Sequence, residues 1–334
     1  MDRSLTRRNS LLFLTLLAFS ACLLLASRCS TATGKLPLGA IPFPEDNPLT
    51  EEKIALGRKL FFDKRLSDDN SISCADCHRP ELAFTDGRAR SPGFHDSLSQ
   101  RNSPTLLNSA YLKTVMFDGE LKTLEMQVIV PIQEHSEMHS DMKKLILELR
   151  AVPEYEAAAQ KIFGRTFDPW VLTRSIAAFE RTLISQNSAF DRFYAGDQRA
   201  LTASQKRGWK LFSEELYCTK CHQPPHFTNY EVRNNGLYSD YGTDQGRYRI
   251  DGLESSKGLF KVPTLRNIAL TGPYMHNGSF RSLDDVLDHY RSGGKKHPNQ
   301  SEIIVAFDLN EQKRSDLLNF FQALSDTSYL RYFQ

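Results

Sequence analysis

The sequence has little excess of either charge. Its 334 residues include 42 lysines and arginines against 40 aspartates and glutamates. Without residues 1–33, which hold four basic residues and one acidic residue, 38 basic and 39 acidic residues remain. A nearly neutral chain does not indicate a nucleic-acid-binding surface or a polybasic membrane-binding segment. We therefore expect no nucleic-acid partner.

Long apolar runs are also scarce, and the one that stands out lies at the N-terminus. Residues 11–27 are uncharged and mostly apolar, and they follow Arg3, Arg7 and Arg8. This layout is typical of a secretory signal peptide, so we expect export to the periplasm. The run is 17 residues long, at the short limit for a membrane span, so an uncleaved membrane anchor is the alternative.

Cysteine is rare as well. Two of the six cysteines, Cys22 and Cys29, fall within the first 33 residues, which leaves four. These four occur in two copies of one pattern, CADCH at 74–78 and CTKCH at 218–222. If both pairs are used by the same chemistry, no cysteine remains for a structural disulfide, in spite of an oxidising compartment.

Several chemistries use a CxxC pair: a redox disulfide, half of a zinc site, or two halves of structural disulfides. A histidine directly after the second cysteine is instead typical of covalent haem c. Each thiol adds to a vinyl group of the haem to form a thioether, and the histidine ligates the iron. The sequence thus predicts two covalently bound haem c groups, attached through Cys74, Cys77, Cys218 and Cys221 and ligated by His78 and His222.

The surroundings of the two motifs resemble each other. The matching pairs are GRKLF at 57–61 with GWKLF at 208–212, Phe-Thr at 84–85 with 227–228, and PTLLN at 104–108 with PTLRN at 263–267. The last pair is offset by 159 residues, an offset that also matches Gly119 with Gly278 and Leu124 with Leu283. Such self-similarity predicts an internal duplication of one haem-binding unit.

Apolar residues at helical spacing predict helices over 141–150, 170–184, 283–290 and 311–324. The segments 87–104 and 223–258 are rich in Gly, Pro, Ser, Asn and Asp and are expected to be long loops packed on haem. The expected fold is mostly α, with two cytochrome-c-like haem domains. Residues 34–190 form the first, with linking helices, and residues 191–334 the second, after the signal segment 1–33.

The same offset predicts that the two haems differ. It places Pro131 opposite Tyr290. Proline has no donor atom for iron, whereas tyrosine can ligate as a phenolate. We therefore expect an open iron face opposite His78, where a small molecule can bind, and a six-coordinate iron between His222 and Tyr290, suited to electron transfer. His289 or His297 is the alternative ligand for the second iron.

Further motifs resemble those of the bacterial di-haem cytochrome c peroxidase and MauG family. They are RNSPT at 101–105, FDG at 117–119, PIQ at 131–133, and PTLRN followed by PYMHNG at 263–278. The resemblance extends from about residue 36 to residue 332. It implies that hydrogen peroxide is the substrate and that the N-terminal haem is the peroxidatic one.

The resemblance also implies roles for single residues. Glu137 matches the distal acid and base of O–O bond cleavage, and Gln127 matches another distal-pocket position. Phe117 occupies the place between the haems where the family usually has a tryptophan, which is easier to oxidise. Tyr290 agrees with MauG, because ordinary di-haem peroxidases present methionine there. Residues close enough to substitute for Glu137 are Glu134, His135 and His139.

Two further expectations come from the resemblance. A calcium ion would lie between the domains, held largely by backbone carbonyls, at positions matching Asn102, Thr271 and Pro273. Some family members block the peroxidatic iron with a loop histidine. His95 lies in the corresponding loop, one residue off the expected spacing, so it is either such a ligand or an ordinary loop residue.

Three functional hypotheses remain open from the sequence. The first is peroxide reduction with electrons from a small cytochrome c or copper protein. The second is a MauG-type reaction, in which a partner-protein side chain, often tryptophan, supplies the electrons; Tyr290 favours it and Phe117 weakens it. The third is a non-enzymatic di-haem electron carrier with both irons six-coordinate.

Overall fold

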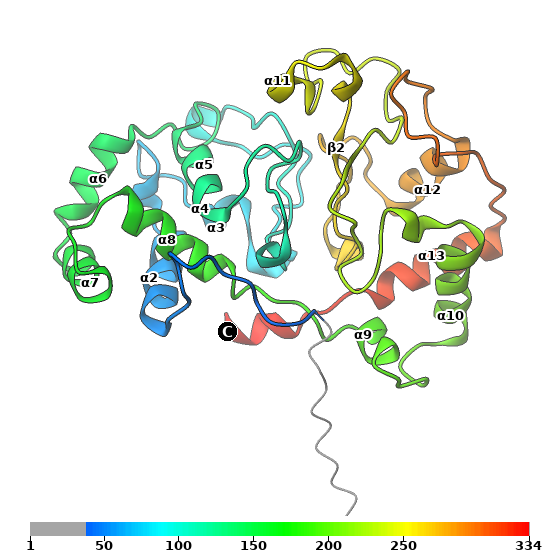
Figure 1. Ribbon diagram of the computed structural model, residues 1–334, viewed down its shortest axis with the longest axis horizontal. Coiled ribbons are helices and arrows are strands. Elements are labelled where there is room, and N and C mark those ends of the chain that lie inside the picture. Colours follow the sequence, from blue (N-terminus) through cyan, green and yellow to red (C-terminus); the bar gives the residue numbers. More distant parts are fainter. Residues whose placement is uncertain (1–37, 334) are drawn as a thin grey trace, which may run out of the picture. The chain divides into compact units, whose positions relative to one another are not determined.

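Helices and short helical turns make up most of the regular structure of residues 38–333, the part of the chain that the computed structural model describes (Figure 1). The predicted signal segment lies outside these residues. Within them, the named strands are β1 (Val232–Arg233) and β2 (Phe260–Lys261), which pair antiparallel. No helix of residues 38–333 has the length and apolar character needed to cross a membrane. The expectation of a mostly α protein is confirmed.

The α-helices are α2 (Glu51–Phe61), α3 (Cys74–Cys77), α4 (Leu124–Gln127), α5 (Ile129–Gln133), α6 (Met142–Arg150), α7 (Pro153–Phe163), α8 (Pro169–Glu180), α9 (Ala189–Tyr194), α10 (Ala203–Lys210), α11 (Tyr248–Asp251), α12 (Leu283–Ser292) and α13 (Glu311–Ala323). The 3₁₀ turns are η1 (Lys64–Leu66), η2 (Pro80–Leu82), η3 (Phe94–Asp96), η4 (Ser109–Tyr111), η6 (Cys218–Lys220), η7 (Glu254–Ser256), η8 (Ile268–Leu270) and η9 (Ser328–Tyr332), and η5 (Leu211–Glu215) is a π-helical turn.

The four helices expected from apolar spacing are present as α6, α8, α12 and α13. The predicted end of α8 at Ile184 was wrong, because the helix ends at Glu180. Its start is set by Asp168, whose side chain accepts a hydrogen bond from the Val171 amide, and by Pro169 in the first turn. The apolar spacing continues past the helix into the turn that follows, so periodicity alone could not locate the end.

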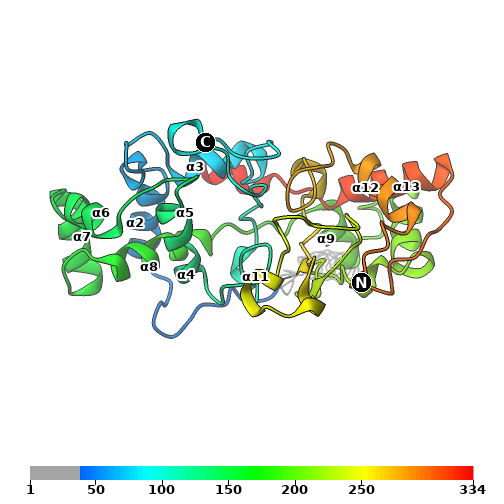
Figure 2. The same ribbon diagram turned by 90° about the horizontal axis from the view of Figure 1, so that it is seen from above.

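Apolar side chains gather in two main clusters. One includes Phe61, Phe84 and Phe179 and draws on α2, α6, α7 and α8. The other includes Phe212 and Phe320 and draws on α9, α10, α12 and α13. Figures 1 and 2 show the same two groups of helices. Residues before about 184 therefore build one core and residues from 190 to 324 build the other, with Tyr329 returning to the first.

Local structure recurs at the 159-residue offset. α4 and α5 together run from Leu124 to Gln133 and α12 runs from Leu283 to Ser292, and each begins after a capping hydroxyl, Thr123 or Ser282. Further matching features are the bridges Val115–Leu121 and Tyr274–Phe280, and left-handed backbone at Asn108 and Asn267, Met116 and Met275, Gly119 and Gly278. The offset read from the sequence therefore also aligns the backbone of the two halves.

Each half contains one close helix crossing. A Cβ atom on Gly57 of α2 would lie 1.8 Å from the carbonyl oxygen of Ser175 in α8. A Cβ atom on Gly208 of α10 would lie 2.0 Å from the carbonyl oxygen of Asp316 in α13. Only glycine allows these backbones to touch, which explains why both repeats, GRKLF and GWKLF, begin with glycine.

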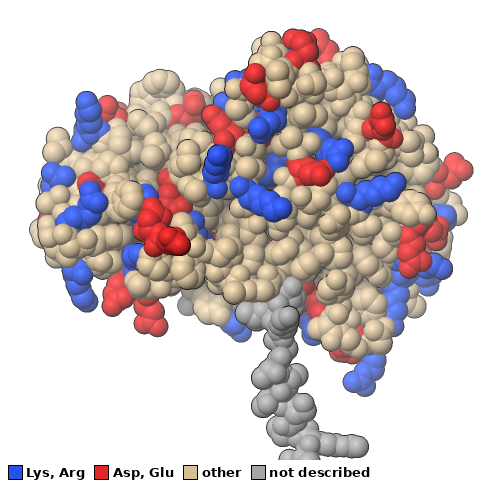
Figure 3. Space-filling model, viewed as in Figure 1, with Lys and Arg blue, Asp and Glu red and all other residues tan. Residues whose placement is uncertain are grey.

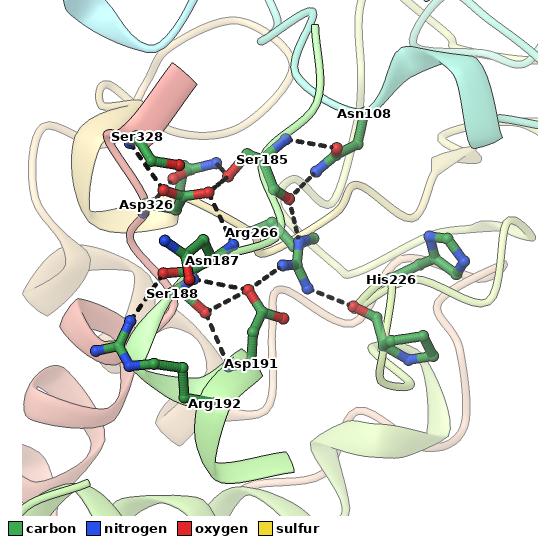
Figure 4. Close-up of polar contacts among 12 residues, drawn as sticks. Asn108, Ser185, Asn187, Ser188, Asp191, Arg192, His226, Arg266, Asp326 and Ser328 are labelled. Carbon is green, nitrogen blue, oxygen red and sulfur yellow. Dashed lines mark hydrogen bonds and ion pairs between the residues drawn. The ribbon is translucent and has the colours of Figure 1, made fainter. Parts of the chain in front are cut away.

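A buried polar network ties the two halves together (Figure 4). The Asn108 side chain donates to the Ser185 carbonyl and accepts from the Ser185 amide, both at 2.9 Å. Asn267 repeats this pattern by accepting from the Asp326 amide at 2.8 Å and also donates to Ser185 Oγ at 2.8 Å. Ser185 Oγ in turn donates to the Asp326 carboxylate. The asparagine that ends each PTLLN or PTLRN motif thus holds the chain that follows α8 or α13.

Candidate functional site

A cavity of about 1310 Å³ lies between the two CxxCH motifs and is lined by both of them. Pockets for one drug-sized ligand usually measure roughly 300–1,000 Å³, so this volume is large enough for more than one large group. The sequence-predicted residues all line this cavity: Cys74, Cys77, His78, Asn102, Phe117, Gln127, Glu137, Cys218, Cys221, His222, Thr271, Pro273 and Tyr290. The fold therefore brings them together from both halves.

His78 is oriented by backbone contacts. It follows α3, whose four residues carry both cysteines of the first motif, and its Nδ1 lies 3.0 Å from the carbonyl oxygen of Phe84. A carbonyl can only accept, so Nδ1 carries the proton and Nε2 keeps a lone pair. Burial lowers the pKa of His78, which favours the neutral form that binds metals.

His222 has the same arrangement in the second half. Its Nδ1 lies 3.1 Å from the carbonyl oxygen of Phe227 and 3.2 Å from that of Pro263. Burial lowers its pKa to about 4, so the ring is neutral at pH 7 with Nε2 free to act as a ligand. Phe84 and Phe227, the first residues of the two Phe-Thr repeats, thus supply the backbone carbonyls that orient the two histidines.

The four cysteines of residues 38–333 form no disulfide with one another. Burial raises the pKa of Cys77 to about 11 and that of Cys218 to about 12, and raises the pKa of Cys74 and Cys221 as well. A redox-active pair needs a lowered thiol pKa, so these environments do not favour a catalytic disulfide. Within the described residues, no group of three or more His, Cys, Asp and Glu side chains is placed to hold a metal ion, so a zinc site is not favoured either.

The first half supplies the groups expected on the distal side of His78. Gln127 ends α4, and Pro131 lies within α5. Both line the cavity together with Glu137. Burial, and then the charge of Glu134, raise the pKa of Glu137 to about 7. A carboxyl with this pKa can both accept and release a proton near neutral pH.

The backbone around Glu137 is held by a neighbouring loop. The Phe94 amide donates to the Glu137 carbonyl at 2.7 Å, and Ser97 Oγ donates to the Ser136 carbonyl at 3.2 Å. A Cβ atom on Gly93 would lie 1.9 Å from the Ser136 oxygen, so this contact requires glycine. The position of the Glu137 carboxyl therefore depends on the loop that contains His95.

His95 itself does not line the cavity, and its ring stacks on Phe94 with centroids 3.9 Å apart. His135 and His139, considered as substitutes for Glu137, also lie outside the lining, with their Nδ1 atoms 2.7 Å apart. Glu134 does line the cavity, but its carboxylate accepts from Ser136. This geometry favours Glu137 over Glu134, His135 and His139 as the group that transfers protons in the cavity. It also favours an ordinary loop residue over an iron ligand as the role of His95.

Tyr290 lies in α12 and lines the second half of the cavity. Its hydroxyl oxygen accepts a hydrogen bond from Asn235 Nδ2 at 3.5 Å, and burial raises its pKa. The alternative ligands lie elsewhere: His289 Nε2 is 3.0 Å from the Asn235 carbonyl, and His297 Nδ1 accepts from the Asn299 amide. Neither histidine lines the cavity.

Met275 was not considered from the sequence, yet it lines the same part of the cavity as Tyr290. Its sulfur lies 3.4 Å from Asn235 Nδ2, the atom that also contacts the Tyr290 hydroxyl. Thioether sulfur is a common haem ligand. The second half therefore offers two side chains that can ligate iron, Met275 and Tyr290, and both contact Asn235. Only Tyr290 lies in the helix that corresponds to the helix containing Pro131.

The residues assigned to calcium come from both halves. The Asn102 amide nitrogen donates to the carbonyl of His276 at 2.8 Å, and its side-chain nitrogen donates to the Arg88 carbonyl. Asn102, Thr271 and Pro273 all line the cavity. The neighbouring Arg101 joins the same region by pairing with Asp118 and Asp244.

Two charged side chains in the cavity were missed from the sequence. Glu180 is 4% exposed, one of its carboxylate oxygens has no hydrogen-bond partner within residues 38–333, and burial raises its pKa to about 8. Lys261 lies in β2, and burial lowers its pKa to about 8. Sequence patterns gave no sign of either, because each depends on which segments surround the side chain.

Figure 3 shows basic and acidic side chains intermixed over the face in view. Many are paired, such as Arg314 with Asp284 and Lys144 with Asp68. This agrees with the nearly balanced composition.

Residues 51–199 match the family model described as di-haem cytochrome c peroxidase. The chain is 38% identical to the methylamine utilization protein MauG of Methylorubrum extorquens, over 85% of this chain and 81% of that protein. It is 34% identical to the cytochrome c551 peroxidase of Pseudomonas aeruginosa, over 80% and 82% of the two chains. Among solved structures, a MauG-like protein associated with microbial copper homeostasis is 32% identical with a TM-score of 0.83, over 91% and 97%.

Proposed function

This chain is a member of the di-haem cytochrome c peroxidase and MauG family of oxidoreductases, and we propose that it reduces hydrogen peroxide at the haem ligated by His78. The family implies two haem c groups, and the chain fits them. Two partly buried, neutral histidines line one large cavity with Nε2 free, and each follows a pair of cysteines that also lines it. Attachment through thioethers to these four cysteines is part of the proposal.

The observation that carries the proposal is the contrast between Pro131 and Tyr290. These residues occupy equivalent places in helices that begin 159 residues apart, at Leu124 and Leu283. Proline offers no ligand, so a haem held by His78 would keep a free face for peroxide, beside Gln127 and Glu137. Tyrosine offers a phenolate, so a haem held by His222 and Tyr290 would be closed to small molecules and suited to electron transfer.

A haem held by His78 would supply the redox chemistry for the reduction of peroxide when bound. Glu137 moves the proton: its carboxylate accepts the proton of the peroxide oxygen nearer the iron and delivers it to the outer oxygen, which then leaves as water rather than hydroxide. The pKa of about 7 suits both steps. Gln127 borders the same space and can hold the peroxide by a side-chain hydrogen bond.

Two electrons and two protons must be supplied for each peroxide that becomes two waters. In the first candidate function, a small cytochrome c or copper protein delivers the electrons through the haem on His222. Phe117 lies between the halves, and its carbonyl accepts from the Lys261 amide at 2.6 Å. Phenylalanine is hard to oxidise, so Phe117 would not carry a radical between the two haems, and electron transfer past it would need direct tunnelling.

A MauG-type reaction is the second candidate, and Tyr290 favours it. A phenolate ligand stabilises ferric iron and lowers the potential of the second haem, which makes that haem a poor resting store of electrons. Such a haem is suited to sharing oxidising equivalents with the first haem after peroxide has reacted. A partner-protein side chain such as tryptophan would then supply the electrons and be oxidised. The 38% identity to a MauG protein supports this alternative.

The remaining parts of the proposal concern organisation. The repeated caps, bridges and glycine crossings support an internal duplication, with the haem domains at 34–190 and 191–334. A calcium ion at Asn102, Thr271 and Pro273 would fix the two domains to each other, and covalent haem attachment agrees with the periplasm. A carrier with two closed irons, the third hypothesis, would need a sixth ligand that Pro131 does not supply.

The test is steady-state peroxide consumption by the di-haem protein with a reduced small cytochrome c as the electron donor. Rapid turnover that falls by roughly 10²–10⁴-fold in Glu137→Gln supports peroxide reduction assisted by this carboxyl. If the donor is not oxidised but peroxide still reacts with the protein, the second candidate replaces the first. If peroxide does not react with the di-haem protein at all, both are wrong.

A further inference from the structure

The cavity is lined by several cationic side chains, and most of them already have partners. Arg101 pairs with Asp118 at 2.8 Å and Asp244 at 2.7 Å, and Arg249 pairs with Asp118 at 2.8 Å. Arg233 pairs with Glu231 at 2.5 Å. Lys220 is exposed to solvent, with its ammonium 5.2 Å from the centre of the Tyr217 ring.

Lys261 differs from these groups. No carboxylate of residues 38–333 lies within ion-pair distance of its Nζ, and burial is the sole cause of its lowered pKa, which is about 8. Its side chain is partly exposed and lines the cavity. An ammonium withdrawn from water without a counter-ion costs several kcal/mol, so native proteins seldom keep one unpaired.

The backbone holds Lys261 firmly in this place. Its amide donates to the Phe117 carbonyl at 2.6 Å, and it pairs with Val232 across the β1–β2 ladder. Successive side chains of a strand point to opposite faces. Phe260 stacks on His276, with centroids 3.9 Å apart, and lies beneath the Arg101 guanidinium, so Lys261 points away from that cluster.

We propose that Lys261 is the counter-ion of a haem propionate carboxylate, at the part of the cavity where the two halves meet beside Phe117. This inference rests on the proposed function, because it needs haem in the cavity. Each haem carries two propionates, which are anionic at neutral pH. When an unpaired ammonium and an unpaired carboxylate meet in the same cavity, their attraction offsets the free energy that each loses on leaving water.

The pairing has a consequence for the haem itself. A positive charge close to the porphyrin edge favours the reduced state, because reduction adds an electron to the nearby iron. Lys261 therefore raises the potential of the haem whose propionate it binds. At a junction between two haems, this charge influences the direction in which electrons move.

The test uses the full di-haem protein and three variants: Lys261→Met, Lys261→Arg and the control Lys257→Met. Lys257 lies four residues earlier on the same segment and pairs with Glu254 at 2.7 Å. Haem content is measured first, and the midpoint potentials of both haems are then measured by spectroelectrochemical titration. We expect Lys261→Met to lower one potential, Lys261→Arg to stay close to the wild type, and Lys257→Met to leave both potentials unchanged.

Loss of a haem from Lys261→Met but not from Lys261→Arg would also support the pairing, because arginine keeps the positive charge that methionine lacks. Unchanged potentials in Lys261→Met, an equal fall in Lys257→Met, or equal loss of haem from both Lys261 variants would overturn it. Failure of the proposed function would be visible separately, as a wild-type protein that does not hold two haems.

Discussion

At the scale of single residues, the surroundings of three side chains that line the cavity, Glu137, Tyr290 and Glu180, change their acidity. Burial raises the pKa of all three, since each would carry a negative charge when ionised. In the proposed roles, Glu137 transfers a proton and Tyr290 gives up its proton to an iron. Glu180 has no role in the proposed chemistry. Its ionisation should therefore change the free energy of unfolding rather than the rate of the reaction.

Ionisation of Glu137 should determine the acid limb of the pH–rate profile, which is the range of low pH in which the rate constant for the reaction with peroxide rises with pH. The carboxylate form accepts the proton, so the rate constant for the reaction with peroxide should rise with pH up to about 7 and then level off. Glu137→Gln should remove this limb as well as slowing the reaction. Stopped-flow measurements between pH 5 and 9 would show both effects.

Glu134→Gln is the matched control. The charge of Glu134 helps to raise the pKa of Glu137, so its removal should move the limb to lower pH without abolishing it. An acid limb that persists unchanged in Glu137→Gln would mean that another group transfers the proton.

Tyr290 should control the potential of the second haem. Replacing it with methionine exchanges an anionic oxygen ligand for a neutral sulfur, which favours ferrous iron. Tyr290→Met should therefore raise the midpoint potential of one haem and leave the other nearly unchanged. Met275→Leu is the control, because Met275 lies beside the same asparagine. If Met275→Leu changes the spectrum and Tyr290→Met does not, methionine rather than tyrosine is the ligand.

Glu180 should make the folded protein less stable at alkaline pH. Its folded-state pKa of about 8 lies above the ordinary value of 4.5, so between these values the folded state holds a proton that the unfolded state has lost. Stability must then fall as pH rises from about 4.5 to about 8. Glu180→Gln, a neutral mimic, should gain up to roughly 3–5 kcal/mol over the wild type above pH 8 and nothing below pH 4.5. Urea unfolding at pH 5 and pH 8.5 measures the difference, and an equal effect at both would contradict it.

At the scale of secondary-structure elements, two helix pairs, α2 with α8 and α10 with α13, form the frame of the two cores. Gly57 and Gly208 allow each pair to touch through its backbone. Gly57→Ala should destabilise the protein by about 3 kcal/mol, because the added methyl group forces the helices apart. Glu52→Ala, on the exposed side of α2, should cost less than about 0.5 kcal/mol. Chemical denaturation compares them, and equal costs would mean that the crossing is not tight.

The helices and the repeat could be read from the sequence because both depend on local order along the chain. α6, α12 and α13 were found from apolar spacing, and the 159-residue offset was found from short motifs that recur in the backbone. The end of α8 was misplaced because its apolar pattern continues into the following turn. The spacing of apolar residues shows which face of a helix is buried. The residue at which the helix ends depends instead on capping and on the side chains that pack against its last turn.

At the scale of the whole molecule, the site is assembled from distant segments, and this limits what a sequence can reveal. The motifs identified His78, His222 and Tyr290, which the fold brings to one cavity. Lys261 and Glu180 could not be predicted, because their burial results from packing between segments far apart in the chain. The hydrogen bonds by which Asn108 and Asn267 join Ser185 to both halves could not be predicted for the same reason.

The unequal pair of haems is the central claim, and electron paramagnetic resonance of the ferric protein tests it most directly. An open iron at His78 should give a high-spin signal, and a closed iron between His222 and Tyr290 should give a low-spin signal. Stoichiometric hydrogen peroxide should then abolish the high-spin signal. Two low-spin signals that peroxide leaves unchanged would contradict the account.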